Sequence, residues 1–158
     1  MSNQPMIPYS TTIHVKDTCL CLHAQRAARV LARRFDVALK SLGLTNQQFS
    51  LMMSLNRPKP PSMAPVARLL AMDRTTLTAA LKPLTSRGWV AVDPDPEDRR
   101  GKLLKLTSAG MAVLSAALPI WTDTHREIEA ELSSGNPDSL RRDLLELGAP
   151  ELTRPRAA

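Results

Sequence analysis

The chain has 158 residues, enough for one domain with a substantial core, and its hydrophobic content of 43% argues against global disorder. Its formal net charge of +6 is unevenly placed: residues 57–105 hold ten basic and five acidic residues, whereas residues 123–151 hold three basic and eight acidic ones. This asymmetry is typical of nucleic-acid binding through the middle of the chain, while two Phe, two Trp and one Tyr are too few for a platform that stacks single-stranded bases.

Several classes of protein are excluded by missing features. No apolar run approaches the about 20 residues of a membrane span, and residues 1–14 lack the apolar core of a signal peptide. We therefore expect a cytoplasmic protein with reduced cysteines and no membrane partner. A glycine-rich phosphate loop, a nucleophile elbow and paired carboxylates in a pocket-like context are also missing, so we expect neither an enzyme nor a bound cofactor.

The chain is predicted to begin with an arm and a long helix. Residues 1–14 contain Pro5 and Pro8 and are predicted to form a flexible arm that can cross to a partner subunit. The long helix is predicted over residues 15–42, ending at Gly43. Apolar residues recur at helical spacing on one of its faces: Leu20, Ala24, Ala27, Leu31, Phe35, Ala38 and Leu42.

Two shorter helices are predicted next. Thr45 and Gln48 have the spacing of a capping box, which predicts the start of a second helix. Residues 57–61 include three prolines and break the chain. Ser62 is predicted to cap a third helix that runs to Ala71.

A fourth helix is predicted over residues 73–88, with two different faces. The apolar face is expected to dock on the rest of the domain, and it consists of Leu77, Ala80, Leu81 and Leu84. The opposite face is short, polar and free of acids, and it consists of Thr75, Thr78, Ala79, Lys82 and Ser86. Such a face fits a major groove about 12 Å wide, although it also suits an ordinary solvent-exposed helix. With the third helix it would form a helix-turn-helix whose second helix enters the groove.

Two short strands are predicted between residues 90 and 106. Apolar residues alternate with polar or small ones in the pattern of half-buried strands, at Val90, Val92, Leu104 and Leu106. The predicted hairpin is a wing beside the fourth helix.

The tip of this wing carries a cluster of charges. Residues 94–98 contain two prolines and must turn. Arg99, Arg100 and Lys102 therefore lie at or just after the tip, where an Arg can enter a minor groove and its neighbours can contact phosphate. Asp98 is interpreted as a local partner that orients an Arg.

The carboxyl-terminal part is predicted to be helical. Thr107 is expected to cap a long helix that bends near Pro119 and ends at about Leu132, and a last helix ends near Leu147. Residues 149–158 are expected to form a flexible tail. The long terminal helices have more apolar surface than a small winged helix can cover, so we expect them to pack on a second copy.

Three elements at this spacing carry a family resemblance: DRTTLT, DPEDRR and LT-x-x-G. With them, the chain resembles the multiple-antibiotic-resistance-regulator (MarR) family of bacterial winged-helix repressors over residues 15–148. The resemblance implies a mainly α fold with a small β-wing: a DNA-binding winged helix at 45–106 between dimerisation helices at 15–44 and 107–148. Relatives that share the LKPL run imply that the helix containing Pro83 stays whole.

The resemblance also implies a function. A homodimer would bind a palindromic operator in double-stranded DNA, with its two recognition helices about 34 Å apart, and a small ligand or an oxidant would release it. We expect DNA contacts from Arg74, Thr75, Thr76, Thr78, Lys82, Arg99, Arg100 and Lys102. At Ala79 the chain departs from many members, which carry a polar or basic residue there.

The first hypothesis for the switch is a small organic effector. In this family it is often an aromatic acid, bound between the dimer helices and the winged domain. Met52, Met53 and His23 are candidates for the wall of its site. A pair of methionines is also typical of plain core packing.

An oxidant-sensing thiol is the alternative. Cys19 and Cys21 are expected in one helix, pointing about 160° apart, so they cannot bridge. Cys21 resembles the reactive cysteine of peroxide-sensing members, eight residues before an Arg that here is Arg29. The aromatic hydroxyls near the thiol in those sensors have no counterpart, and position 25 is Gln. Inert packing and a thiol that lines a ligand pocket therefore stay open.

Two weaker alternatives complete the set. Cys19 and His23 share a helix face, and His14 or His125 could complete a metal site. No carboxylate cluster joins them, so no metal is expected. A scaffold that kept the winged fold for protein contacts would not need the arginines of the wing.

Overall fold

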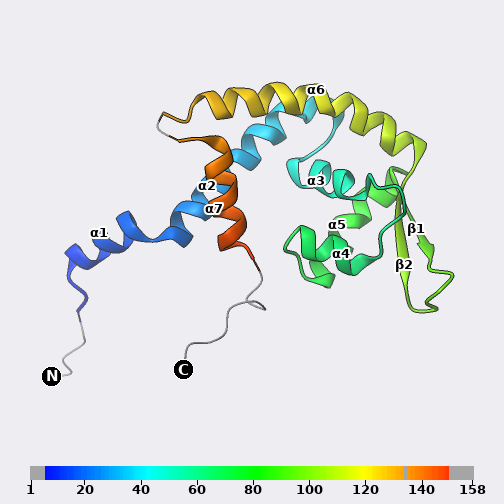
Figure 1. Cartoon of the computed structure of the whole chain (residues 1–158), viewed down its shortest axis with the longest axis horizontal. Coiled ribbons are helices and arrows are strands. Elements are labelled where there is room, and N and C mark those ends of the chain that lie inside the picture. The colour runs from blue at the N-terminus through cyan, green and yellow to red at the C-terminus, as the bar shows by residue number, and fades with distance from the viewer. Residues whose placement is uncertain (1–5, 134, 150–158) are drawn as a thin grey trace.

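The computed structural model describes residues 6–133 and 135–149, and two long helices arch over a smaller helical lobe that carries a β-hairpin (Figure 1). The mainly α architecture with a small β-wing confirms the predicted fold class. In chain order the elements are α1 (Tyr9–Thr18), α2 (Leu20–Ala38), the 3-10 helix η1 (Lys40–Leu42), α3 (Asn46–Leu55), α4 (Met63–Leu69), α5 (Arg74–Ser86), β1 (Val90–Pro94), β2 (Lys102–Leu106), α6 (Ser108–Ala130) and α7 (Pro137–Leu147).

The amino-terminal helix differs from its prediction in three respects. It begins at Tyr9 rather than at residue 15, so the later part of the predicted arm is helical, while residues 1–5 lie outside the described part. It is also interrupted at Cys19, whose backbone is extended (φ −71°, ψ 104°) and whose sulfur accepts a hydrogen bond from the Leu22 amide at 3.4 Å. Cys19 thus caps α2. Helix α2 itself ends at Ala38, before the predicted end, and the separate 3-10 helix η1 is the element that stops at Gly43.

Local capping decides where α3 begins, and tertiary pairing decides where α4 begins. The Thr45–Gln48 capping box is confirmed, with reciprocal hydrogen bonds of 3.2 and 3.1 Å. Ser62 precedes α4, but its side chain makes no capping bond. Instead, Ser62 forms an antiparallel bridge with Leu103, so this segment extends the edge of the wing sheet. The helix ends at Leu69, two residues before the predicted end.

Helix α5 is continuous through Pro83, as predicted. Its apolar face enters the core of the lobe, where Leu77, Leu81 and Leu84 are buried. The end of the helix is tied to the turn before α3, because a guanidinium N–H of Arg87 donates to the Gly43 carbonyl.

The two predicted strands pair in antiparallel register. Val90 lies opposite Leu106 and Val92 lies opposite Leu104. Val90 and Leu104 are buried, whereas Val92 is 37% exposed because it lies toward the free end of the hairpin. The ladder continues to Pro94, so the turn occupies residues 95–101 rather than starting at 94.

The LT-x-x-G element anchors α6 against the hairpin. The Thr107 hydroxyl donates to the Gly88 carbonyl at 2.6 Å and accepts the Gly110 amide at 3.0 Å. A Cβ at Gly110 would lie 2.0 Å from the Trp89 carbonyl oxygen, so only glycine allows this approach.

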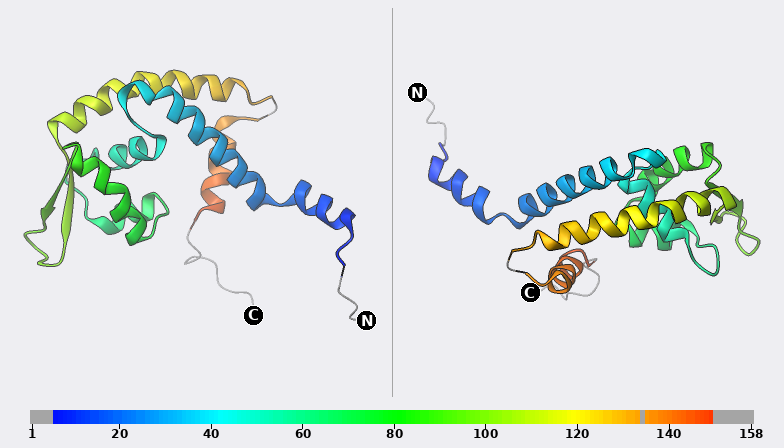
Figure 2. Two further views of the ribbon diagram at one scale, coloured as in Figure 1. Left: turned by 180° about the vertical axis from the view of Figure 1, so that it is seen from behind. Right: turned by 90° about the horizontal axis from the view of Figure 1, so that it is seen from above.

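Helix α6, which contains Pro119, is gently curved and packs beside α2 (Figures 1 and 2). Near its end, Arg34 of α2 donates two hydrogen bonds to Glu131, at 2.6 and 2.8 Å. These bonds hold the pKa of Glu131 below its usual value. Within the described residues, no helix is long and apolar enough to cross a membrane.

Candidate nucleic-acid interface

The outward face of α5 is open to solvent along its length. All residues of the predicted outward face are exposed, namely Thr75, Thr78, Ala79, Lys82 and Ser86, and so are Arg74, Thr76 and Pro83. Opposite them, Leu77, Leu81 and Leu84 anchor the helix in the core. The lobe therefore presents the polar side of α5 and holds it rigidly from behind.

The start of α5 is fixed by Asp73. One carboxylate oxygen accepts the Thr76 amide at 2.7 Å and the other accepts the Thr76 hydroxyl at 2.8 Å. These bonds, with the amide bond as the larger cause, hold the pKa of Asp73 below its usual value. The Thr78 hydroxyl donates to the Arg74 carbonyl. The Thr75 hydroxyl makes no hydrogen bond within the described residues, so it is the threonine of this turn that is free to donate.

The tip of the wing is organised by two aspartates that accept backbone amides. Asp95 accepts from Glu97 and Asp98 accepts from Arg100, both at 2.9 Å. A Cβ at Gly101 would lie 2.9 Å from the Cβ of Asp95, which requires glycine where the two turns converge. Asp98 therefore positions Arg100 through its backbone amide. Among the described residues, the Arg100 guanidinium forms no salt bridge with a carboxylate.

A basic groove of about 610 Å³ lies between α4, the start of α5 and the wing tip. Arg68, Arg74, Arg100 and Lys102 line it, with Asp98 as its acidic member. Three of these cations are predicted from the sequence. Arg68 is not among the predicted DNA contacts, because the third helix is predicted only as support for the fourth. A positive charge on the exposed side of that third helix is the signal that could have identified Arg68.

A second groove of about 450 Å³ runs between α5 and β1. Arg74 and Lys102 line this groove as well, and Thr78 and Lys82 join them. The two grooves therefore meet along the line from the start of α5 to the start of β2. Arg99 lines neither groove and is exposed near the wing tip.

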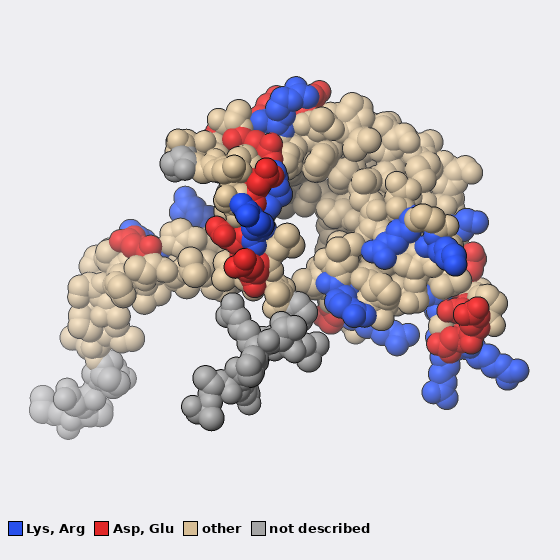
Figure 3. All heavy atoms as spheres, viewed as in Figure 1, with Lys and Arg blue, Asp and Glu red and all other residues tan. Residues whose placement is uncertain are grey.

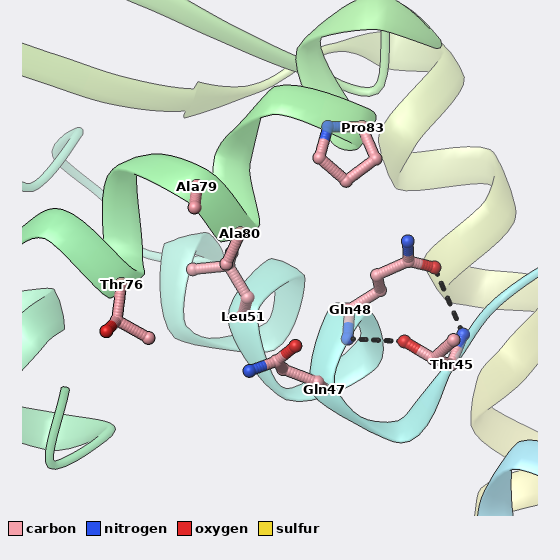
Figure 4. Close-up of a pocket in the computed structure, with 8 residues that line it drawn as sticks. All are labelled: Thr45, Gln47, Gln48, Leu51, Thr76, Ala79, Ala80 and Pro83. Atoms are coloured by element: carbon pink, nitrogen blue, oxygen red, sulfur yellow. Dashed lines mark hydrogen bonds between the residues drawn. The ribbon is translucent and has the colours of Figure 1, made fainter.

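On its other side, α5 borders a groove of about 400 Å³ against the start of α3 (Figure 4). Its lining is uncharged, with Gln47, Thr76, Ala79 and Pro83 among its residues. The positive charge around α5 thus lies toward the wing. Figure 3 shows the same distribution, with Lys and Arg side chains projecting around the wing end and a small acidic cluster between them.

The candidates for the switch are not brought together in one place. Met52 is fully buried in the core, whereas Met53 is 38% exposed and borders a crevice beneath α6. Cys21 is exposed and accepts a hydrogen bond from the Gln25 amide at 3.1 Å. His23 is exposed on α2, with Nδ1 2.8 Å from the Cys19 carbonyl oxygen.

Two predictions about the thiols change with the fold. Cys19 is not inside a helix, so the argument that it and Cys21 project from one helix in opposite directions does not hold. The metal site considered for Cys19, His23 and a third histidine does not form either. Among the residues that the structure describes, no group of three or more His, Cys, Asp and Glu side chains could hold a metal ion. His125 instead stacks on Trp121, with ring centroids 4.7 Å apart.

Comparison with known proteins identifies this arrangement. A family model described as MarR family matches residues 44–102. The multiple antibiotic resistance protein MarR of Escherichia coli K12 is 31% identical over 103 residues, which cover 65% of this chain and 72% of that protein. The chain belongs to the MarR family. Within the family, the transcriptional repressor NicR of Pseudomonas putida is 36% identical over 93 residues, which cover 59% of this chain and 56% of NicR.

The structural comparison agrees. The transcriptional regulator MosR of Mycobacterium tuberculosis, solved in complex with DNA, superposes with a TM-score of 0.75 and 37% identity, covering 82% of this chain and 93% of that one. The protein is thus a DNA-binding transcriptional regulator with the winged helix-turn-helix fold of the MarR family. Members of this family are transcriptional regulators and not enzymes.

Proposed function

We propose that the protein is a homodimeric repressor that binds a palindromic operator and is released by a small organic effector. Each subunit inserts α5 into a major groove, and the wing follows the neighbouring minor groove. The two-fold axis of the dimer sets the two copies of α5 about one turn of DNA, or about 34 Å, apart.

The observation that carries this proposal is the charge around α5. Arg68, Arg74, Arg100 and Lys102 come from four different segments and converge on one groove beside an exposed, acid-free helix face. Cations that surround a helix in this way neutralise the phosphates on the walls of a groove while the helix reads the bases. We expect Arg99 at the tip to enter the minor groove.

The dimer is supported by apolar surface that the single chain leaves open. Every residue of α2 from Leu20 to Val30 is exposed. On α7 the exposed leucines are Leu140, Leu144, Leu145 and Leu147. Isolated apolar residues are normal on a surface, but a helix exposed on all sides for three turns requires a partner. Light scattering at micromolar concentration should give the mass of two chains, and a monomeric mass would contradict the operator geometry.

DNA binding is tested with the duplex from upstream of the protein's own gene. Fluorescence anisotropy should show tight binding that weakens steeply with salt, because each phosphate contact releases counterions. Arg100→Ala should weaken binding to every duplex and lessen the salt slope by about one unit for each phosphate that the protein no longer neutralises. Binding to no duplex at low salt would refute the proposal.

The effector is proposed to act at the crevice beneath α6. This crevice lies between the lobe that holds α5 and the helix that leads to the dimer interface, so a ligand there can change the position of one relative to the other. The family resemblance implies an aromatic acid. Titration of the protein–operator complex with a panel of aromatic compounds, read by anisotropy, tests for release.

Oxidant sensing by Cys21 is the second candidate, favoured by one set of contacts. The Gln25 amide donates to the exposed sulfur, and Arg29 donates to the Gln25 oxygen at 3.2 Å. Accessible thiols beside polar donors and cations are the ones that oxidants reach. Mild peroxide should then abolish operator binding in the wild type and spare Cys21→Ser. Equal loss in both proteins, or no loss in either, excludes this role for Cys21.

A further inference from the structure

The crevice beneath α6 has the dimensions of a small-molecule site. Its volume is about 370 Å³, which lies within the range of ligand pockets. Residues of α3, α4 and α6 form its walls, including Phe49, Met53, Leu69, Leu118 and Trp121. The space suits a compound of one or two rings.

Its chemistry differs from that of the two grooves on the wing side of α5. Among the residues that the structure describes, none that lines the crevice is charged. Two cations lie close to the lining residues along the chain, but Arg68 lines the basic groove, and the Nε of Arg57 donates to the Ser54 carbonyl at 3.0 Å. A carboxylate buried against these walls would lose part of its hydration without gaining a cation, which is unfavourable.

The walls are well suited to an aromatic ring. Phe49 and Trp121 stack with ring centroids 6.1 Å apart and planes inclined by 19°. Met53, at the edge of the crevice, offers a polarisable thioether that makes favourable contacts with rings. Offset stacking and sulfur contacts add to the gain from burying the apolar surface of the ligand.

The polar capacity of the crevice is small. Ser54 is 7% exposed, and its hydroxyl already donates to the Leu51 carbonyl at 2.6 Å. Ser50 is half-buried, and within the described residues its hydroxyl makes no hydrogen bond. Together they can meet one carbonyl, amide or hydroxyl group of a ligand.

We infer that the effector crevice is selective for uncharged aromatic compounds of one or two rings with a single polar group, and rejects aromatic carboxylates. The inference deepens the proposed function and rests on it for the regulatory consequence. It replaces the aromatic acid implied by the resemblance with a neutral ligand, because the residues that line the crevice in this chain provide no counter-charge.

Ligand binding has a direct route to the DNA-binding face. Phe49 belongs to α3 and is buried in the core that also holds α5, whereas its stacking partner Trp121 belongs to α6. A ring that enters between Met53 of α3, Leu69 of α4 and Leu118 of α6 moves the lobe that contains α3 and α4 away from α6. The spacing of two α5 helices in a dimer changes accordingly.

The test compares two probes of nearly the same shape, the neutral 2-naphthamide and the anionic 2-naphthoate. Calorimetry on the full-length protein should show at least about tenfold tighter binding of the amide, because only the carboxylate loses a hydrated charge. In parallel, anisotropy should show that the amide weakens operator binding. A carboxylate that binds as tightly as the amide, or tighter, overturns the inference.

A charge introduced at the mouth of the crevice locates the binding site. Leu69 is 61% exposed, so Leu69→Lys and its neutral control Leu69→Gln should both fold. Leu69→Lys should raise the affinity for 2-naphthoate at least about tenfold over Leu69→Gln, since an ammonium now faces the carboxylate. Equal affinities in the two variants place the ligand elsewhere and overturn the assignment.

The two proposals can fail separately. If neither probe binds at millimolar concentration to protein that binds its operator, the ligand inference is wrong, and the proposed function as a DNA-binding regulator is unaffected. If 2-naphthamide binds with the predicted selectivity to protein that binds no duplex, the crevice assignment stands and the proposed function is wrong.

Discussion

Replacement of Arg68 by Ala tests the groove that the tertiary structure adds to the interface. Arg68 is exposed on α4 and shares the basic groove with Arg74, Arg100 and Lys102. Each cation that neutralises a phosphate contributes about −0.9 to the slope of log K against log salt concentration. A dimer without these two cations, one from each subunit, should have a slope smaller by about 1.8.

The drop in affinity follows from the same relation. Operator binding by Arg68→Ala should be weaker by about 30-fold at 0.15 M salt and by only about 3-fold at 0.5 M. Anisotropy titrations at four salt concentrations provide the slope. Arg126→Ala is the matched control, because it removes the same charge from α6, where Arg126 pairs with Asp123 outside the groove. A slope equal to that of the wild type, with the same helix content and mass, would show that no phosphate occupies this groove.

Three further predictions concern stability, each measured by urea unfolding. Above pH 4, Asp73→Ala should unfold at a lower urea concentration than the wild type, because the helix cap needs the charged carboxylate. The difference between the two midpoints should shrink as the pH falls through the lowered pKa of Asp73. A difference that stays constant down to pH 2 would contradict this cause. Gly110→Ala should lower the free energy of unfolding by about 1–3 kcal/mol, because the new Cβ clashes with the Trp89 carbonyl. Gly135→Ala should lower it far less, since a Cβ there meets open space. Equal effects of the two substitutions would exclude the clash as the cause. Leu104→Ala should lower the free energy of unfolding by about 2–5 kcal/mol, because the Leu104 side chain is fully buried. Val92→Ala, at the cross-strand partner that is 37% exposed, should lower it clearly less.

Signals that act within one turn of chain predict local structure correctly. The capping box at Thr45, the cap at Thr107 and the outward face of α5 depend on residues three or four positions apart. Their hydrogen bonds and burial follow from helix geometry, whatever the rest of the fold does.

The predictions fail where distant segments compete with local preference. Ser62 has the composition of a helix cap, yet it bridges to Leu103 in the wing sheet. Cys19 lies in a helical pattern, yet it interrupts the helix, and its sulfur caps the next one.

The sequence by itself determined the fold class, the family and the polar face of α5, because periodicity, capping and short motifs are written along the chain. Only the tertiary structure decided that Arg68 joins the cations of the wing, and that Met53 borders a crevice while its neighbour Met52 is buried in the core. The physical reason is that a groove is made by surfaces far apart in sequence, whose meeting depends on how helices pack and not on any local pattern.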